Sequence, residues 1–328
     1  MELLKYTLED ELFEKYNLTV SEAVPNRKVY LLLTDQGEKY FKKINYPIKE
    51  LYFIYNSLTY ISEKFDRVLS FYKTKEGEIY TNYKGSNYVI LNKVEGREGS
   101  FLNPVDILYM TAALRELHGA SIGLKTDIVE RNKTGALIES LKDKLSKMEL
   151  FYKIGSITNT DFSELFIKNY KKYEEEAKKS ISLLESSNYL KLCRDEKYIS
   201  LNHHDLAHHN IIINEDKAYF IDFDYSIIDL RVHDICNFIN KTNRNFNYDF
   251  EKCNSILNEY NKENALSPEE IKVLYGMLLF PIDVYNLTCN YFTKNKLWQE
   301  EDFLSKLRDK TEKNEFREIF LNEFEKIC

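Results

Sequence analysis

The chain has 328 residues, of which 43% are hydrophobic, enough for one large or two medium domains with cores of their own. Glycine (10) and proline (5) are scarce while Tyr (25) and Phe (20) are abundant, which excludes collagen-like, linker-rich and disordered chains. The formal net charge of -7 argues against a general nucleic-acid binder, because such proteins usually carry positive charge to displace counterions from phosphate.

The sequence shows no sign of a membrane span, a secretory signal or a disulfide framework. The longest apolar run, residues 275–287, is too short to cross a bilayer and is broken by Pro281 and Asp283. The first 17 residues are acidic and amphipathic, unlike a signal peptide. The five cysteines are odd in number and widely spaced, without a CxxC pair. We therefore expect a cytoplasmic protein without membrane or nucleic-acid partners.

The start of the chain reads as strands arranged around one helix. Residues 29–34 and 39–44 are β-type runs, and Asp35-Gln36-Gly37-Glu38 between them contains turn formers, so a hairpin is predicted. Residues 48–65 place apolar side chains on one face of a helix. These side chains are Leu51, Ile54, Tyr55, Leu58 and Ile61.

A second hairpin is predicted after this helix. Residues 68–73 and 78–83 flank Glu76-Gly77, and a further strand is expected over residues 87–93. Two glycines within residues 94–99 then mark a break, after which the pattern becomes helical. We therefore expect a domain boundary near residue 94.

The rest of the chain is mainly helical, with one short β-type region. Asn103-Pro104 is a good N-cap and first-turn pair for a helix that runs towards His118-Gly119. Ser267-Pro268-Glu269-Glu270 has capping-box spacing and opens a helix that Pro281 should bend or interrupt. Further helices are expected over residues 134–151, capped by Thr134, and over residues 161–187 and 300–327. The β-type runs are residues 198–202, 211–214 and 218–222, with residues 215–217 as a turn.

Histidines and carboxylates cluster in this β-type region, where five of the six histidines lie between positions 203 and 233. His203, Asp205 and Asn210 fit the pattern H-x-D-x-x-x-x-N, in which the aspartate accepts the proton of an attacking hydroxyl and the asparagine binds a metal ion. The hairpin that follows delivers Asp222, whose carboxylate can hold Mg²⁺ against nucleotide phosphates. The pattern therefore indicates phosphoryl transfer.

Four segments of the sequence point to one family. Residues 203–210 (HHDLAHHN) and 221–224 (IDFD) match a loop that commonly reads H-G-D-x-H-x-x-N and is followed by I-D-F/W-D/E. Residues 95–98 (EGRE) and 117–123 (LHGASIG) contain a "GRE" turn and an "LH-x-A-S-x-G" helix end in the same order. Together they resemble the CotS-type spore-coat proteins of the aminoglycoside phosphotransferase and choline kinase superfamily, over nearly the whole chain.

The resemblance implies an α+β, bilobal protein-kinase-like fold. Residues 1–93 would form an antiparallel β nucleotide-binding lobe with one helix, and residues 94–328 a larger, mainly helical catalytic and substrate lobe. A helical insertion, about residues 120–200, would select the acceptor; its acidic residues would suit a cation, although a charged helix face is more often simply solvated. The implied reaction uses ATP and Mg²⁺ to phosphorylate a small-molecule hydroxyl. Other spore-coat proteins become candidate partners, and the spore coat a candidate location beside the cytoplasm.

The resemblance also assigns roles to individual residues. Asp205 matches the catalytic base, and Asn210 and Asp222 match the metal ligands. His203 and Asp234 are expected to support the loop, His203 by hydrogen bonding and Asp234 by bracing it from the start of a helix.

The nucleotide-binding residues leave two alternatives open. Lys42 matches the strand lysine that pairs with nucleotide phosphates, and its rival Lys43 points to the opposite face of the strand. Glu50 is the nearest acidic residue on the following helix that could hold this lysine, and Glu63 is the second candidate.

One turn and two single residues depart from the family pattern. The first β-turn, residues 23–28, contains no glycine, whereas close approach of backbone to phosphate usually needs one. His204 and Ala207 stand where the family often has Gly and His. These departures concern nucleotide binding and the geometry of the catalytic loop.

A competing interpretation is a metal phosphohydrolase of the HD type, prompted by His203, His233-Asp234 and Asp283. Ligands of that type sit on helices of an all-α fold, whereas the first histidines here are flanked by strand-like residues. The strand-like flanks disfavour this interpretation.

A third hypothesis is a kinase-like fold kept as a structural or interaction component of a spore coat, catalytically weak or silent. Coat assembly would depend on the protein surface rather than on the catalytic motif. Retention of Asp205, Asn210, Asp222 and Lys42 favours the enzyme, because a purely structural loop does not need that set.

Overall fold

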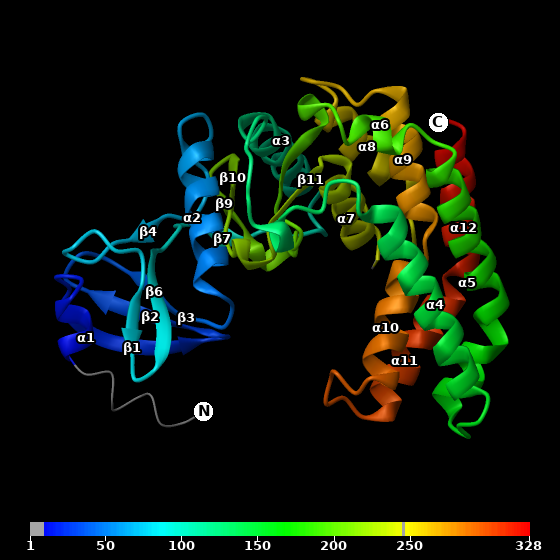
Figure 1. Ribbon diagram of the computed structural model, residues 1–328, viewed down its shortest axis with the longest axis horizontal. Coiled ribbons are helices and arrows are strands. Elements are labelled where there is room, and N and C mark those ends of the chain that lie inside the picture. The colour runs from blue at the N-terminus through cyan, green and yellow to red at the C-terminus, as the bar shows by residue number, and fades with distance from the viewer. Residues whose placement is uncertain (1–9, 245–246) are drawn as a thin grey trace. The chain divides into compact units, whose positions relative to one another are not determined.

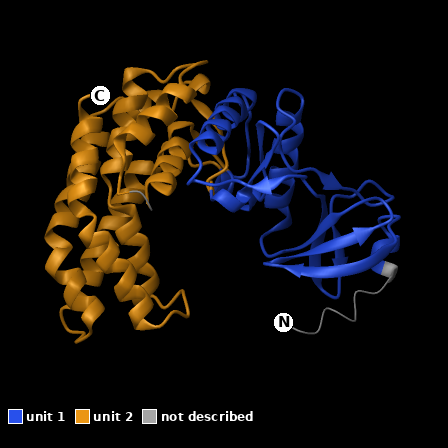
Figure 2. Ribbon diagram, turned by 180° about the vertical axis from the view of Figure 1, so that it is seen from behind, with its two compact units in different colours: residues 1–131, 207–226 blue, residues 132–206, 227–328 orange. Residues whose placement is uncertain are grey.

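The computed structural model describes residues 10–244 and 247–328 (Figure 1). The chain divides into two compact units, which are coloured separately in Figure 2. Unit 1 comprises Met1–Arg131 and Ala207–Ser226, and unit 2 comprises Asn132–Leu206 and Ile227–Cys328. The predicted catalytic loop, residues 203–210, therefore begins in unit 2 and ends in unit 1.

Unit 1 contains the predicted antiparallel sheet, with strand order β1-β2-β3-β6-β4 and β5 paired to β6. Its strands are β1 (Val20–Asn26), β2 (Val29–Thr34), β3 (Lys39–Ile44), β4 (Phe71–Tyr72), β5 (Thr81–Tyr83) and β6 (Ser86–Asn92). β2 and β3 form the predicted hairpin, in which Tyr30 lies opposite Phe41. Leu32, Phe41 and Ile90 alternate with outward residues and are buried in one core cluster.

α2 (Ile48–Ser62) is the helix predicted among these strands. The apolar residues at helical spacing are buried, except for the half-buried Tyr55. Leu51 packs with Ile44 of β3 and Val89 of β6, which fixes the helix to the sheet. The helix ends at Ser62 rather than continuing to residue 65.

The predicted second hairpin between residues 68–73 and 78–83 is wrong. β4 and β5 do not pair with each other, and both pair with β6 instead. The cause is a tight turn at Lys84 and Gly85, which both have positive φ values of 48° and 77°. This turn sets Tyr83 opposite Ser86, so β5 and β6 form the local hairpin.

A second, small sheet and a long helix complete unit 1. Its strands are β7 (Arg97–Glu98), β9 (Ile211–Asn214) and β10 (Lys217–Phe220), in the order β10-β9-β7. α3 (Pro104–Ala120) lies against β10, and its predicted cap is confirmed: Asn103 Oδ1 accepts a hydrogen bond from Val105 N–H at 3.0 Å. The remaining elements of unit 1 are α1 (Asp10–Glu14), η1 (Val129–Arg131), η3 (His208–Asn210) and η4 (Phe223–Tyr225).

The "GRE" turn joins this small sheet to α3. Gly96 has φ +132°, and a Cβ there would lie 2.4 Å from the backbone oxygen of Ile213, so no larger residue fits. Arg97 then donates to both carboxylate oxygens of Asp106 at 2.6 Å. Asp106 is fully buried in the first turn of α3, and its pKa is lowered, chiefly by these bonds from Arg97.

Unit 2 is mainly helical, as predicted for the C-terminal part (Figure 2). Its helices are α4 (Leu137–Gly155), α5 (Asp161–Glu185), α6 (Tyr189–Leu192), α7 (Val232–Asn243), α8 (Phe250–Tyr260), α9 (Pro268–Leu279), α10 (Ile282–Phe292), α11 (Glu300–Glu312) and α12 (Asn314–Glu325). β8 (Ile199–Asn202), preceded by η2 (Glu196–Tyr198), pairs antiparallel with β11 (Ile227–Leu230). None of the helices in the described part of the chain has the length and apolar character of a membrane span.

Local signals in unit 2 were predicted with mixed success. The Ser267 capping box is present at the start of α9, and Pro281 separates α9 from α10. Thr134 does not cap α4, because Ala136 occupies that position and the Thr134 hydroxyl has no hydrogen-bond partner. Residues 300–327 form two helices that meet at Lys313.

Candidate active site

The hairpin of β9 and β10 positions the two predicted metal ligands in unit 1. Ile211 lies opposite Phe220, and the N–H of Ile221 donates to the carbonyl of Asn210 at 3.0 Å, which extends the ladder by one step. Asn210 directly precedes β9 and is 4% exposed. Asp222 follows β10 with a left-handed φ of 63°, a conformation that only a few non-glycine residues adopt. Both side chains thus leave the same end of the hairpin.

Lys42 lies against Asp222 in the same unit. Its Nζ is 2.6 Å from Asp222 Oδ1 and 2.8 Å from Asp224 Oδ1, and its side chain is 14% exposed. Burial alone lowers the pKa of Lys42, but the two carboxylates outweigh burial, so the pKa is raised and the amine stays charged. Lys43, on the opposite face of β3, is exposed to solvent.

The structure does not pair Lys42 with Glu50, the acidic residue expected to hold it. Glu50 Oε2 instead accepts a hydrogen bond from Arg131 Nε at 2.7 Å. Arg131 also donates to the carbonyls of Asp224 at 2.6 Å and Ser226 at 2.9 Å. A guanidinium has five N–H donors, so Arg131 can satisfy all three partners at once. The ammonium of Lys42 is bound instead by the two carboxylates beside it. Glu50 thus positions the segment after Asp222.

The glycine-free turn is a tight connection between β1 and β2. Asn26 lies opposite Val29, so only Arg27 and Lys28 form the turn, and Arg27 takes the left-handed conformation with φ 54°. Its guanidinium pairs with Glu98 at 2.7 Å, in an exposed ion pair. The turn therefore reaches without glycine a conformation that glycine adopts more easily.

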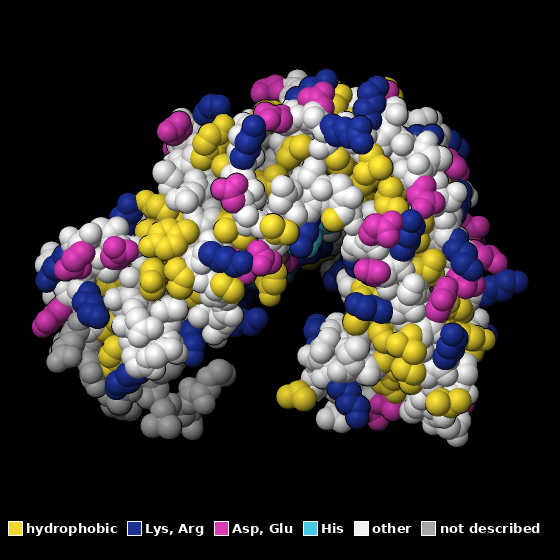
Figure 3. Space-filling view, in the orientation of Figure 1, with side chains coloured by type: hydrophobic (Ala, Val, Ile, Leu, Met, Phe, Trp, Pro, Cys, Tyr) yellow, Lys and Arg dark blue, Asp and Glu magenta, His cyan; other side chains and the backbone are white. Residues whose placement is uncertain are grey.

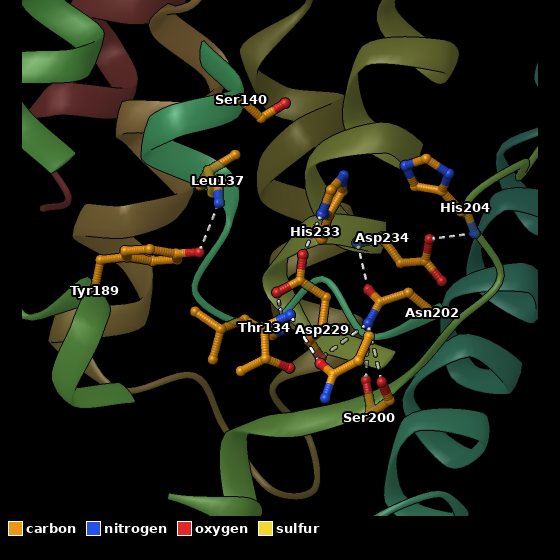
Figure 4. A network of polar contacts seen from close by, with 12 residues as sticks. Thr134, Leu137, Ser140, Tyr189, Ser200, Asn202, His204, Asp229, His233 and Asp234 are labelled. Atoms are coloured by element: carbon orange, nitrogen blue, oxygen red, sulfur yellow. Dashed lines mark hydrogen bonds and ion pairs between the residues drawn. The ribbon is translucent and has the colours of Figure 1, made fainter. Parts of the chain in front are cut away.

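In unit 2, Asp234 holds the start of the predicted catalytic loop (Figure 4). Its carboxylate accepts hydrogen bonds from the backbone N–H of His203 at 2.5 Å and of His204 at 2.9 Å. Its own N–H donates to Asn202 Oδ1 at 3.0 Å, which ties the first turn of α7 to the end of β8. Asp234 and His203 are both fully buried. Asp234 thus ties the first residues of this loop to α7.

Asp205 lies two residues further along this loop. Its backbone N–H donates to His203 Nδ1 at 3.3 Å, so the buried imidazole orients the loop. Its carboxylate accepts a hydrogen bond from Lys241 Nζ at 2.5 Å. Lys241, on α7, was not singled out in the sequence. Its only sequence signal is that His233, Asn237 and Lys241 follow one another at four-residue intervals, which places all three on one helix face.

His204 has the backbone conformation expected where the family often has glycine. Its φ is 66°, in the left-handed region that costs a side-chain-bearing residue roughly 1–2 kcal/mol. His204 is exposed as a whole residue, yet loss of hydration around its imidazole and the nearby His233 lower its pKa to about 4. Burial works to lower the pKa of His233 too, but Asp229 Oδ2, 2.9 Å from its Nδ1, raises it overall.

A cavity of about 450 Å³ adjoins these residues within unit 2. Its wall includes His204, His233 and Lys241, together with residues of α4 and of the junction between α9 and α10. The volume lies within the range of small-molecule sites. In Figure 4, His233 is seen between Leu137 and Ser140 of α4 on one side and His204 on the other.

The residues of the hydrolase interpretation do not form a metal centre. Among the described residues, no group of three or more His, Cys, Asp or Glu side chains could hold a metal ion. Asp283 pairs with Arg244 and Lys310. The histidine-rich loop lies between β8 and β9 rather than on helices, as its strand-like flanks predicted.

Comparison with known proteins identifies the family. Residues 9–324 match the family described as "Spore coat putative kinase YutH". Spore coat protein S of Bacillus subtilis (strain 168) is 21% identical over 311 residues, which are 92% of this chain and 88% of that protein.

Solved structures show the same fold at low sequence identity. The aminoglycoside phosphotransferase from Alicyclobacillus acidocaldarius is similar with a TM-score of 0.85 and 15% identity, over 97% of this chain and 96% of that one. The choline kinase LicA from Streptococcus pneumoniae has a TM-score of 0.55 and 13% identity, over 94% and 98% of the two chains. The chain therefore belongs to the kinase-like spore coat family, with the fold of the aminoglycoside phosphotransferases and choline kinases, as the sequence motifs predicted.

Proposed function

We propose that this protein transfers the γ-phosphoryl group of ATP to the hydroxyl of a small molecule, with Mg²⁺ as cofactor. The observation that carries the proposal is the ion pair of Lys42 with Asp222 and Asp224. It holds a charged lysine beside carboxylate oxygens, the ligand type that Mg²⁺ prefers. Lys42 would neutralise phosphate charge, and Asp222 and Asn210 would hold the metal. A spectinomycin phosphotransferase of similar fold was solved with ADP, which supports nucleotide binding by this fold.

Asp205 would align the acceptor hydroxyl and take its proton. The acceptor oxygen bonds to the γ-phosphorus while the bond from that phosphorus to the bridging oxygen breaks, so ADP leaves and the hydroxyl proton passes to the carboxylate. His203 and Asp234 fix the loop that carries Asp205. The cavity in unit 2 would receive the acceptor.

As expected from the sequence, residues 1–93 would form the nucleotide-binding lobe and residues 94–328 the catalytic lobe. Membership of a spore coat family supports assembly into the coat, with other coat proteins as partners and ATP encountered in the cytoplasm beforehand.

Titration of the purified protein with ATP tests the proposal. ATP with Mg²⁺ at a hundred-fold excess over its Kd should stabilise the protein by about 2.7 kcal/mol, measured as a rise in Tm. Asp222→Asn should remove the dependence of this stabilisation on Mg²⁺, whereas Asp216→Asn, in the exposed turn between β9 and β10, should not.

A screen of hydroxyl metabolites for ATP consumption tests the catalytic step. In this screen, Asp205→Asn should lower turnover by about 10²–10⁴-fold and leave ATP affinity unchanged. A protein that neither binds ATP in a calorimeter nor gains Tm refutes the proposal.

A coat component without turnover is the second candidate. It is favoured by the glycine-free turn at Arg27 and by the separation of Glu50 from Lys42 in their ion pairs. It predicts no heat of ATP binding and normal coat incorporation of Asp205→Asn. Loss of coat function in Asp205→Asn, with its abundance unchanged, would favour the enzyme.

A further inference from the structure

The cavity in unit 2 has a basic wall, in a chain whose net charge is -7. The wall contains four cationic side chains and two carboxylates. The cationic residues are Lys133, Lys144, Lys241 and Arg244.

Both carboxylates of the wall already have cationic or imidazole partners. Asp229 is bonded to His233, at 2.9 Å. Asp283 is paired with Arg244 and, at 3.6 Å, with Lys310. Each has been satisfied by protein groups, so neither offers an unopposed negative charge to a cationic ligand.

Lys144 is in the opposite situation. Its Nζ donates to Ser140 Oγ at 2.5 Å and lies 5.9 Å from the centre of the Tyr285 ring, while no carboxylate of the described residues comes within ion-pair distance. The side chain is half-buried, and loss of hydration, followed by repulsion from Lys147, lowers its pKa, while the attraction of nearby Asp143 opposes this shift. A partly dehydrated cation without a direct ion-pair partner is costly, and an anionic ligand would offset that cost.

The expected acceptor-selecting segment, about residues 120–200, contributes two lysines and no carboxylate to the wall. Two of its acidic residues lie on α5 and pair with neighbouring cations: Glu174 with Lys178 at 2.9 Å, and Glu176 with Arg317 at 2.6 Å. On the face of unit 2 in Figure 3, acidic and basic side chains are interspersed. The acidity of this segment therefore gives no reason to expect a cationic acceptor.

We propose that the acceptor is an anionic hydroxyl compound, whose carboxylate or phosphate group is bound by Lys144 in the cavity of unit 2. This inference rests on the proposed function, since it names the class of molecule that the kinase would phosphorylate. Apolar residues of the wall would contact the carbon skeleton. They are Leu137, Leu141, Met277, Phe280 and Ile282.

Four small hydroxyl compounds separate the possible charges: D-glycerate, glycerol 3-phosphate, glycerol and choline. Their binding to the full chain is measured by calorimetry, for the wild type, Lys144→Met and Lys147→Met. Lys147 is the matched control, because it lies on α4 one turn away, is exposed and is not part of the cavity wall. The carboxylate and phosphate probes show which anionic group is preferred.

At least one anionic probe should bind more tightly than glycerol and choline. Lys144→Met should weaken that probe by about ten-fold or more, as expected for the loss of one hydrogen bond between charged groups, and Lys147→Met should not. Lys144→Glu, a second variant, should reverse the preference in favour of choline. Anionic probes that bind no better than glycerol overturn the inference, as does an anion affinity that survives Lys144→Met. ATP stabilisation, measured separately, decides the proposed function whichever way the probes bind.

Discussion

Lys42 and Asp205, which carry the most definite roles in the proposed reaction, each lie in an ion pair within their own unit. Lys42 contacts Asp222 and Asp224, and Asp205 contacts Lys241. In both pairs the cation is less exposed than the carboxylate it binds. Binding of phosphate and metal would replace these ion pairs with charge-assisted contacts to the ligands. The affinity for the ligands would therefore depend on the free energy needed to break each ion pair.

Lys42→Met tests this at the level of one residue. Loss of the ammonium removes the counter-charge of two neighbouring carboxylates, so ATP affinity should fall by about ten-fold or more, and Tm should also fall. Lys43→Met is the matched control, since Lys43 is exposed on the opposite face of β3 and should change neither value. Calorimetry with ATP and Mg²⁺, together with Tm, measures both. If ATP affinity falls equally in the two variants, Lys42 is not distinguished from Lys43 as the lysine that binds the nucleotide phosphates.

At the scale of elements, signals confined to a few residues were predictable. Asn103 and Ser267 cap helices as expected, because a cap needs only the side chain and the N–H groups two or three residues ahead. The turn around Asp35 and Gly37 likewise specified the β2–β3 hairpin. The second hairpin failed because residues 78–83 had two possible partners, and the turn at Lys84-Gly85 decided between them.

Contacts between distant segments could not be predicted in the same way. β11 pairs with β8 across more than twenty residues, and its four residues are all buried, so no alternation marked it as a strand. The motif gave Asp205, Asn210 and Asp222, but not their surroundings. Arg131 contacts the segment after Asp222 in unit 1, and Lys241 contacts Asp205 in unit 2. Only the packed structure shows which loop or helix face brings each of them there.

The α9 cap has consequences beyond its own helix. Glu270, at the N3 position of the capping box, accepts from the Ser267 N–H and also binds the buried Arg231 at 2.6 and 2.8 Å. Arg231 precedes α7, so the cap of α9 also holds the start of α7. Ser267→Ala should therefore cost about 1–2 kcal/mol, at the upper end for a cap.

Urea denaturation measures this cost as a lower unfolding midpoint. Ser182→Ala, at an exposed position inside α5, is the control and should be neutral or slightly stabilising, because alanine has the higher helix propensity. An equal loss in both variants would mean that the cap contributes nothing of its own.

At the scale of the whole molecule, unit 1 contains segments from both sides of the predicted lobe boundary near residue 94. The N–H of Leu69 donates to the carbonyl of Phe220 at 3.1 Å, and the N–H of Phe220 donates to the carbonyl of Arg67 at 3.0 Å. Phe220 is fully buried and its ring lies 6.4 Å from that of Phe65. We therefore predict that residues 97–131 and 211–220 unfold together with the N-terminal sheet.

Native-state hydrogen exchange in rising denaturant tests this prediction with two reciprocal variants. Phe220→Ala should lower the opening free energy of amides in β3, β6, α3 and β9 by about 3–5 kcal/mol, because each belongs to unit 1. Amides of α5 and α9 should keep their wild-type protection. Phe324→Ala, which removes an equally buried ring from α12, should produce the opposite pattern. If Phe220→Ala weakens α3 and β9 but leaves β3 and β6 unchanged, the cooperative boundary lies near residue 94; if it weakens α5 as well, the chain unfolds as one body.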